Sequence, residues 1–118
     1  MSQQDCLFCR IVHREIPADI TAEADGLLAF NDINPQAPTH LLIVPTEHIP
    51  SLAEVTEAHT ALVGNAVHFA NRLARQHQLT DAGSGYRLVI NCGPQAGQSV
   101  GHLHVHLLGG RALRWPPG

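Results

Sequence analysis

Residues 102–108 read His-Leu-His-Val-His-Leu-Leu, a run in which imidazole and aliphatic side chains alternate. Successive side chains of an extended strand point to opposite sides, so His102, His104 and His106 are predicted to share one face. The aliphatic residues then share the other face, and the chain must contain a sheet whose two faces differ in chemistry. Two strand rises separate neighbouring imidazoles by roughly 6.5–7 Å, so the outer rings can flank a group held by the middle one. A His-rich surface strand and a nonspecific metal-binding tract are alternatives that these residues alone leave open.

The rest of the chain divides into short apolar segments between turn signals, with one long amphipathic stretch. We predict strands at 19–23, 26–31, 39–44, 86–91 and 102–108, a short helix at 6–13, and a long helix that ends near residue 73. Ser51 and Thr56 are alternative N-caps of the long helix, and Asp25-Gly26 predicts a hairpin turn. Because most connections have hairpin length, we expect an α+β fold with a five-stranded antiparallel sheet and its helices on one face. The length favours a single domain over residues 1–118.

Composition narrows the chemistry that such a fold can support. The seven cationic residues are all Arg, so lysine Schiff-base chemistry and a lysine-dependent P-loop are excluded, whereas histidine occurs nine times. The net charge of −3 and the lack of a basic stripe argue against nucleic acid as a partner. No apolar run approaches the ~20 residues of a membrane span, so no membrane is expected as a partner. The N-terminal residues lack the pattern of a secretory signal, and we therefore expect a cytoplasmic protein.

A glycine-rich loop precedes the histidine strand. Residues 93–101, Gly-Pro-Gln-Ala-Gly-Gln-Ser-Val-Gly, contain enough glycine for backbone N–H groups to converge on an anion, and Ser99 adds a hydroxyl donor. A phosphate bound there would lie beside the face that carries the three histidines. Taken alone, the loop is at least as typical of a flexible hairpin connection.

With these motifs the chain resembles the histidine triad (HIT) family of nucleotide-binding proteins, whose motif His-φ-His-φ-His-φ-φ, with φ apolar, matches residues 102–108. The likeness covers nearly the whole chain: Glu15-Ile-Pro, Leu28-Ala-Phe-Asn-Asp-Ile, Pro35-Gln-Ala-Pro-Thr-His, Gly97-Gln-Ser-Val, Gly109-Gly-Arg and Trp115-Pro-Pro-Gly118. The Ser of Gly-Gln-Ser and the terminal Trp-Pro-Pro-Gly are typical of the Hint branch, whose members hydrolyse nucleoside phosphoramidates. The resemblance implies a HIT-like fold and a purine nucleoside phosphoramidase that forms a covalent nucleotidyl-histidine intermediate.

The resemblance also implies the catalytic residues. His104, the middle histidine, would attack the α-phosphate, and a backbone carbonyl that accepts from its Nδ1–H would leave Nε2 as the nucleophile. His106 and Ser99 would hold the phosphate oxygens together with loop amides. His40 matches the fourth histidine of the family and would hold or relay a proton with His104. His102 would contribute through its backbone carbonyl.

The nucleoside half of a substrate is expected on a mostly apolar surface. Asp32 matches the family carboxylate that accepts hydrogen bonds from both ribose hydroxyls; without the resemblance, a turn or helix-cap role would be preferred. The expected base slot, which would favour purines such as AMP or GMP conjugates, consists of Leu7, Phe8, Ile11, Phe30 and Ile33, each also a candidate core residue. The expected phosphate end adds Gly97, Gln98, Ser99, Val100 and Asn91. In the family two protomers form a homodimer with one continuous sheet, and Trp115 of one tail would serve the partner's site.

A second constellation consists of Cys6 and Cys9, whose Cys-x-x-Cys spacing is typical of zinc ligands. The resemblance implies a structural zinc held by this pair with His48 and His102, while catalysis would require no cofactor. Two small buried helix residues are the alternative. A redox pair is less favoured, because no strand precedes the motif.

Two other functions stay open at this point. One is dinucleoside polyphosphate hydrolysis, the chemistry of another HIT branch, against which Ser99 and the Trp115 tail argue. The other is a nucleotide-binding or regulatory interaction module in which catalysis is slow, because the same residues would form a binding site.

Overall fold

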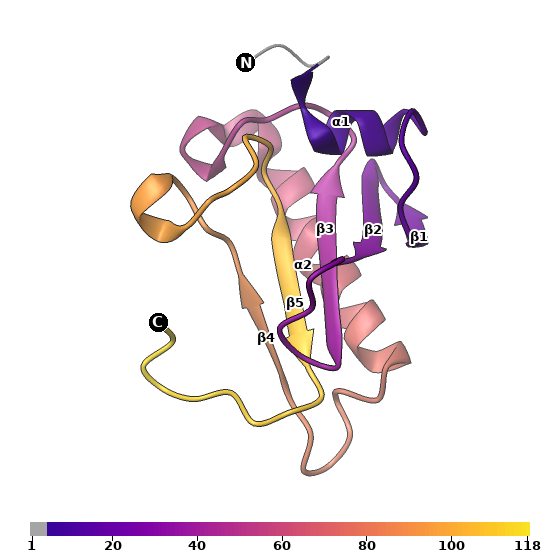
Figure 1. Ribbon diagram of the computed structural model, residues 1–118, viewed down its shortest axis with the longest axis vertical. Helices are drawn as coiled ribbons and strands as arrows, with labels where there is room; N and C mark the ends of the chain where they lie inside the picture. The colour runs from indigo at the N-terminus through magenta and orange to yellow at the C-terminus, as the bar shows by residue number, and fades with distance from the viewer. Residues whose placement is uncertain (1–4) are drawn as a thin grey trace.

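A five-stranded antiparallel sheet organises the chain in the computed structural model, which describes residues 5–118 (Figure 1). In spatial order the strands are β1 (Ile20–Ala24), β2 (Leu27–Asn31), β3 (Thr39–Pro45), β5 (Val105–Gly109) and β4 (Tyr86–Val89). They are accompanied by the helices α1 (Leu7–Val12) and α2 (Thr60–Gln76) and by the 3-10 turns η2 (Leu52–Glu54), η3 (Glu57–His59) and η4 (Pro94–Ala96). The predicted α+β class, with one long and one short helix, is confirmed.

The two faces of the sheet carry two separate hydrophobic clusters, because neighbouring strand residues point to opposite sides. On β3, Leu41 and Ile43 belong to the cluster with α2, whereas Leu42 and Val44 belong to the cluster with α1. Figure 1 shows α2 behind the sheet and α1 across one end of the other face. The expectation of both helices on one face was therefore wrong. The apolar side of α1, formed around residues 8–11, packs on its own set of strand residues.

The long helix begins at Thr60, later than predicted, and its two candidate N-caps serve 3-10 turns instead. The Ser51 hydroxyl accepts a hydrogen bond from the Ala53 amide at 3.2 Å. The Thr56 hydroxyl accepts one from the Ala58 amide at 3.3 Å. Each cap accepts a hydrogen bond from an amide at the start of its turn, which has no partner within the turn. Two short turns therefore precede the helix itself.

The turn between β1 and β2 is confirmed as a hairpin turn. Asp25 and Gly26 have φ values of 53° and 76°. Two successive positive φ angles are characteristic of the type I′ turn, which matches the twist of the flanking strands.

The histidine strand is shorter than predicted, since β5 starts at Val105 and its pairing with β3 ends at Ile43. The preceding residues stay extended without this pairing, and the Leu103 amide donates to the Ile49 carbonyl at 2.6 Å. The alternation of faces nevertheless continues through residues 102–107. Leu103, Val105 and Leu107 are buried, the last two in the α2 cluster, while the histidines face the α1 side. The loop between β4 and β5 therefore shortens both strands, although the side-chain pattern does not change there.

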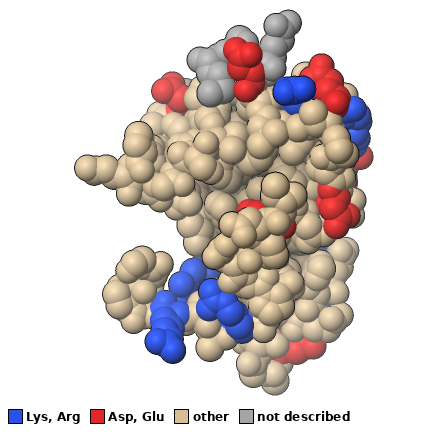
Figure 2. Space-filling model, viewed as in Figure 1, with Lys and Arg blue, Asp and Glu red and all other residues tan. Residues whose placement is uncertain are grey.

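The C-terminal tail runs beside β4, at the edge of the sheet opposite β1 (Figure 1). Arg87 on β4 donates to the Arg114 carbonyl at 2.9 Å, and Arg111 donates to the Gln36 carbonyl at 2.9 Å. Figure 2 shows basic side chains gathered beside the tail and carboxylates mostly elsewhere on this face. Within residues 5–118, no helix is both long and apolar enough to span a membrane. The N-terminal segment in which no signal was expected lies mostly outside the described residues.

Candidate active site and metal centre

A cavity of about 300 Å³ opens on the α1 face of the sheet. Ten predicted residues line it: Leu7, Phe8, Ile11, Phe30, Asp32, Ile33, Ser99, Val100, His104 and His106. Sequence reasoning missed five others: Ile16, Pro17, Ala18, Asn31 and Leu42. The sequence could have predicted Leu42, because it lies two residues from His40 on β3 and therefore on the same face. The segment 16–18 directly follows the predicted short helix, but no pattern in it distinguishes a cavity wall from a connecting loop.

The apolar part of the cavity has a buried wall and an exposed lip. Phe8, Ile11 and Phe30 are buried in the α1 cluster, so they serve as core and as cavity wall at once. Leu7 and Ile33 are 46% and 99% exposed. Large apolar side chains that border a cavity and remain in water favour the binding of an apolar group such as a nucleobase.

His104 is buried, and one of its ring nitrogens is already engaged. Its Nδ1 lies 2.7 Å from the backbone carbonyl oxygen of His102. A carbonyl can only accept, so Nδ1 carries the proton and Nε2 keeps its lone pair. The Phe8 ring meets the His104 ring edge to face at 5.1 Å and limits its rotation. The geometry therefore presents an unprotonated imidazole nitrogen with a fixed orientation.

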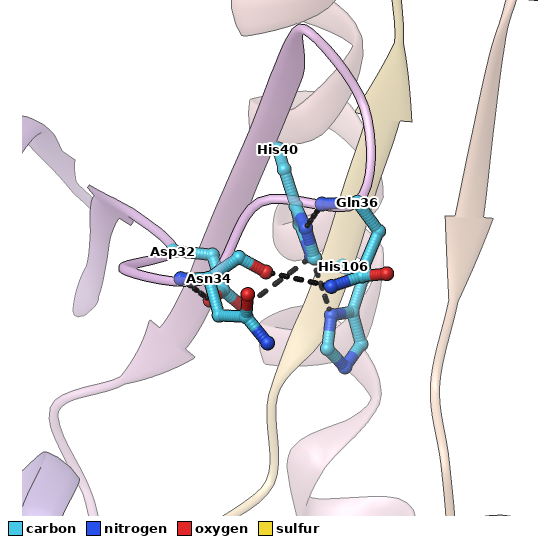
Figure 3. A network of polar contacts seen from close by, with 5 residues as sticks. All are labelled: Asp32, Asn34, Gln36, His40 and His106. Carbon is cyan, nitrogen blue, oxygen red and sulfur yellow. Dashed lines mark hydrogen bonds and ion pairs between the residues drawn. The ribbon is translucent and has the colours of Figure 1, made fainter.

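A chain of polar contacts joins Asp32, His40 and His106 (Figure 3). The Gln36 amide donates to His40 Nδ1 at 3.0 Å, so the proton of a neutral His40 is on Nε2. That nitrogen lies 2.9 Å from His106 Nδ1 and 3.4 Å from the Asp32 carboxylate. His106 Nδ1 must then accept, which leaves the Nε2–H of His106 as a donor. Asp32 also accepts from the Asn34 amide at 2.8 Å.

Burial keeps these imidazoles neutral. Burial, together with the smaller effects of the neighbouring His104 and His40, lowers the pKa of His106 to about 4, partly opposed by Asp32. Burial also lowers the pKa of His40, against the opposing effect of the Asp32 carboxylate. Near pH 7 both rings are therefore neutral hydrogen-bond partners with defined tautomers.

The expectation that His40 holds or relays a proton with His104 stays a prediction. The short contact of the His40 ring is to His106. The reason is the pairing of β3 with β5, in which Leu42 lies opposite His106 and brings that residue's ring beside the neighbouring His40.

Two of the loop amides predicted to bind phosphate have partners within their own turn. The Gly97 amide donates to Pro94 and the Gln98 amide to Gly93, so both close the η4 turn. The Gln98 side chain binds Gly93, Pro50 and Val100 backbone groups and braces the loop. The described residues that line the cavity do not include Gly97, Gln98 or Asn91. Ser99 and Val100 remain as candidate donors.

Two further predicted residues lie away from this cavity. Trp115 is 82% exposed in the tail beside β4, and the His102 side chain lies in a group of possible metal ligands with Cys6, Cys9 and His48. A larger hollow of about 530 Å³ beside the tail, lined partly by Arg87 and Arg111, contains none of the predicted site residues. The chemistry expected from the motif is therefore concentrated in the smaller cavity.

The four predicted zinc ligands come together from three parts of the chain. Cys6 and Cys9 lie at and inside the start of α1, His48 follows β3, and His102 precedes β5. Their ligand atoms all lie within 4.8 Å of one another. Cys6 Sγ is 3.3 Å from His102 Nδ1, and Cys9 Sγ is 3.2 Å from His48 Nδ1. Burial and, after it, the adjacent Cys6 together raise the pKa of the Cys9 thiol to about 11.

Donor chemistry separates this cluster from the second group of possible ligands, Asp32, His40 and His106. His102 Nε2 donates to the Pro45 carbonyl at 2.9 Å, so its Nδ1 lone pair points into the cluster, as in a histidine oriented for a metal. The His40 nitrogen that faces its group instead carries a proton. Two thiols and two imidazoles fit tetrahedral Zn²⁺, whereas the second group fits a hydrogen-bond relay.

The fold and the site define a small α+β protein with a cluster of histidines beside a largely apolar cavity. A family model for the HIT domain matches residues 13–113. A HIT-like protein of Synechococcus elongatus is 52% identical over 98% of this chain and 98% of its own. A 14 kDa zinc-binding protein of Zea mays is 48% identical over 95% of this chain and 87% of its own.

Solved structures of HIT proteins are also similar to this chain over nearly its whole length. A HIT family hydrolase from Legionella pneumophila superposes with a TM-score of 0.92 at 48% identity, covering 97% of this chain and all of that one. A histidine triad protein from Clostridium difficile gives 0.89 at 39% identity, with 97% of each chain covered. The chain belongs to the HIT family.

Proposed function

We propose that this protein is a purine nucleoside phosphoramidate hydrolase of the Hint branch. The observation that carries the proposal is His104, which lines the cavity and whose Nδ1–H is bound to the His102 carbonyl at 2.7 Å, so that Nε2 is the acceptor nitrogen of the neutral ring. The name of the Legionella relative, a hydrolase, supports the class of reaction. The substrate proposed is an AMP or GMP joined to an amine through a P–N bond.

In the first step, His104 Nε2 forms a bond to the α-phosphorus and the P–N bond breaks. The departing amine takes up a proton, which reaches it from solvent water through the hydrogen-bonded imidazoles beside the phosphate. In the second step, water attacks the phosphorus, the bond to His104 breaks, and the water proton returns to solvent. The products are the amine and the nucleoside monophosphate.

His106 and Ser99 stabilise the phosphate in this scheme. The Nε2–H of His106 follows from the chain that starts at the Gln36 amide and passes through His40. A donor fixed in advance toward the phosphate oxygens needs no reorientation as charge develops on them. The Ser99 hydroxyl and the Ser99 and Val100 amides, on the loop that lines the cavity, add donors from the other side.

The nucleoside would occupy the apolar end of the cavity. Asp32 keeps acceptor capacity beyond its bond to the Asn34 amide, since a carboxylate accepts several hydrogen bonds, so it can bind the ribose hydroxyls. The base would lie between the buried wall, formed by Phe8 and Phe30, and the exposed Leu7 and Ile33. Few polar groups lie there, which favours purines through contact area over selection by hydrogen bonds.

We further propose a structural Zn²⁺ at Cys6, Cys9, His48 and His102, with no cofactor taking part in the reaction. The relatives from maize and Brassica juncea named as zinc-binding proteins support this assignment. When bound, the ion cross-links α1 to the two segments that flank β3 and β5. The chain's own residues then do all of the catalytic work.

Three proposals concern the whole molecule. Residues 1–118 form one HIT domain, which functions as a homodimer, and Trp115 of one protomer reaches the partner's site. The exposure of Trp115 and its absence from the described residues that line the cavity of its own chain support that role. Three cysteines that form no disulfide support a reducing compartment such as the cytoplasm.

The test is incubation with adenosine phosphoramidates of different amines and with dinucleoside polyphosphates, followed by mapping of labelled histidine under alkaline conditions, because a P–N bond to histidine is labile in acid. We expect P–N cleavage and adenylylated His104 after a rapid quench. The His104→Ala variant should bind AMP but turn over at least about a thousandfold more slowly. Hydrolysis that persists in this variant refutes the mechanism, and preferential cleavage of dinucleoside polyphosphates would support the other branch. AMP binding without a single turnover would favour a binding module.

A further inference from the structure

We propose that metal binding at the Cys6–Cys9–His48–His102 cluster and nucleotide binding in the cavity are positively coupled, through His102 and α1. The proposal rests on the proposed function in that the cavity is taken to bind a nucleotide. Cys6, Cys9 and His48 would then be positioning residues for the nucleophile, although none of them contacts substrate.

His102 belongs to both sites at once. Its side chain is fully buried, with Nδ1 3.3 Å from Cys6 Sγ and 3.6 Å from Cys9 Sγ. Its backbone carbonyl holds His104 Nδ1 at 2.7 Å. The carbonyl that fixes the nucleophile's tautomer is therefore a few bonds from a side chain whose position the metal cluster determines.

The helix α1 is the second shared element. Cys6 caps its start, with Sγ accepting from the Cys9 amide at 3.4 Å, so both cysteines face the cluster. Leu7, Phe8 and Ile11 of the same helix line the cavity. A six-residue helix has little stability of its own, so its place on the sheet depends on what holds it there.

Phe8 joins these two routes. The centroid of its ring lies 5.1 Å from that of His104, 5.9 Å from that of His102 and 5.5 Å from that of Phe30. A displacement of α1 therefore moves the base wall and loosens the packing that limits rotation of the nucleophile. Without a metal, the thiols and imidazoles of the cluster are held together by sulfur–nitrogen contacts of 3.2–3.6 Å. Four metal–ligand bonds would hold the same residues far more firmly.

Coupling of this kind is reciprocal, which gives it a quantitative test. We would measure the Kd of AMP by calorimetry in zinc-loaded and zinc-free protein, and the Kd of Zn²⁺ by chelator competition with and without saturating AMP. We expect zinc to tighten AMP binding about tenfold, within the usual range of couplings, and AMP to tighten zinc binding by the same factor. Two affinities that are independent to within twofold, in protein that circular dichroism shows to be folded, would overturn the proposal.

A second measurement separates this proposal from the proposed function. In ligand-free protein with isotope-labelled histidine, nitrogen–proton correlation spectra report the tautomer of His104. We expect a single Nδ1–H form with zinc and a mixture of tautomers after zinc removal. Failure of AMP to bind the zinc-loaded protein would refute the nucleotide site, while the His104 spectrum would still decide the coupling; an unchanged spectrum contradicts it.

A variant addresses the case in which the metal-free wild type does not fold. His48 is only partly buried and lies outside the cavity lining, so His48→Asn weakens the cluster with the least damage to the core. The matched control is His77→Asn, on the exposed end of α2. We expect His48→Asn to weaken AMP binding several-fold and His77→Asn to leave it unchanged. Equal AMP affinity in both variants overturns the proposal.

Discussion

Acidification should destabilise this protein through His106, a ring that is buried among His104, His40 and Asp32. Its pKa is lowered to about 4, mainly by burial, from 6.5 in an unfolded chain. Between these two values the unfolded state binds more protons than the folded state, so the free energy of unfolding falls as the pH falls. The loss begins near pH 6.5 and levels off near pH 4. A pKa difference of this size corresponds to about 3 kcal/mol.

The assay is urea unfolding of the wild type and of His106→Asn at intervals from pH 7.5 to pH 4, with identical zinc conditions. Asn keeps a polar group but cannot take up the proton. Proton uptake by His40 and by the zinc ligands occurs in both proteins and cancels to first order in the difference. We expect the wild-type advantage at pH 7.5 to shrink by about 3 kcal/mol by pH 4. A difference between the two proteins that stays constant over this range would refute the argument that burial keeps His106 neutral.

Four further predictions follow from the site and the core. Cys6→Ser should lose bound zinc and lower the melting temperature, whereas Cys92→Ser should keep one zinc per chain; equal metal content by elemental analysis would contradict the cluster. Ser99→Ala should lower kcat for an adenosine phosphoramidate by roughly 10- to 100-fold, since its hydroxyl is a proposed phosphate donor, and an unchanged kcat removes it from that role. Leu107→Ala, at a fully buried position, should cost about 2–5 kcal/mol in urea unfolding. Leu7→Ala, on the exposed lip, should cost little stability but weaken AMP binding, and the opposite result would show that the lip is core.

Local sequence patterns predicted the secondary structure well where one side-chain period dominates. The alternation through residues 102–108 placed Leu103, Val105 and Leu107 inside correctly, and the Asp25-Gly26 turn was located to the residue. The start of the long helix was misplaced because two good capping residues precede it and each caps a separate short turn. A cap residue specifies the turn that follows it, not the length of the helix beyond.

The cavity was predicted largely through the resemblance to a family, since its wall residues are equally good core residues. Phe8 and Phe30 are in fact both. The loop amides show the limit of such reasoning. Glycine content alone cannot tell which amides close a turn, and the amides of Gly97 and Gln98 do so here.

The sequence by itself determined the kinds of groups available: alternating imidazoles, a pair of cysteines at metal-ligand spacing, and a carboxylate beside an apolar segment. Only the tertiary structure decided which of these groups touch. Strand pairing brought His40 against His106, and the packing of α1 on the sheet brought Cys6 and Cys9 to His102. The tautomer of His102 depends on the Pro45 carbonyl, which is 57 residues away in the sequence and meets the ring only when the chain is folded. Side-chain chemistry is local to the sequence, whereas hydrogen-bond partners are chosen by the sheet register, and that register depends on the whole fold.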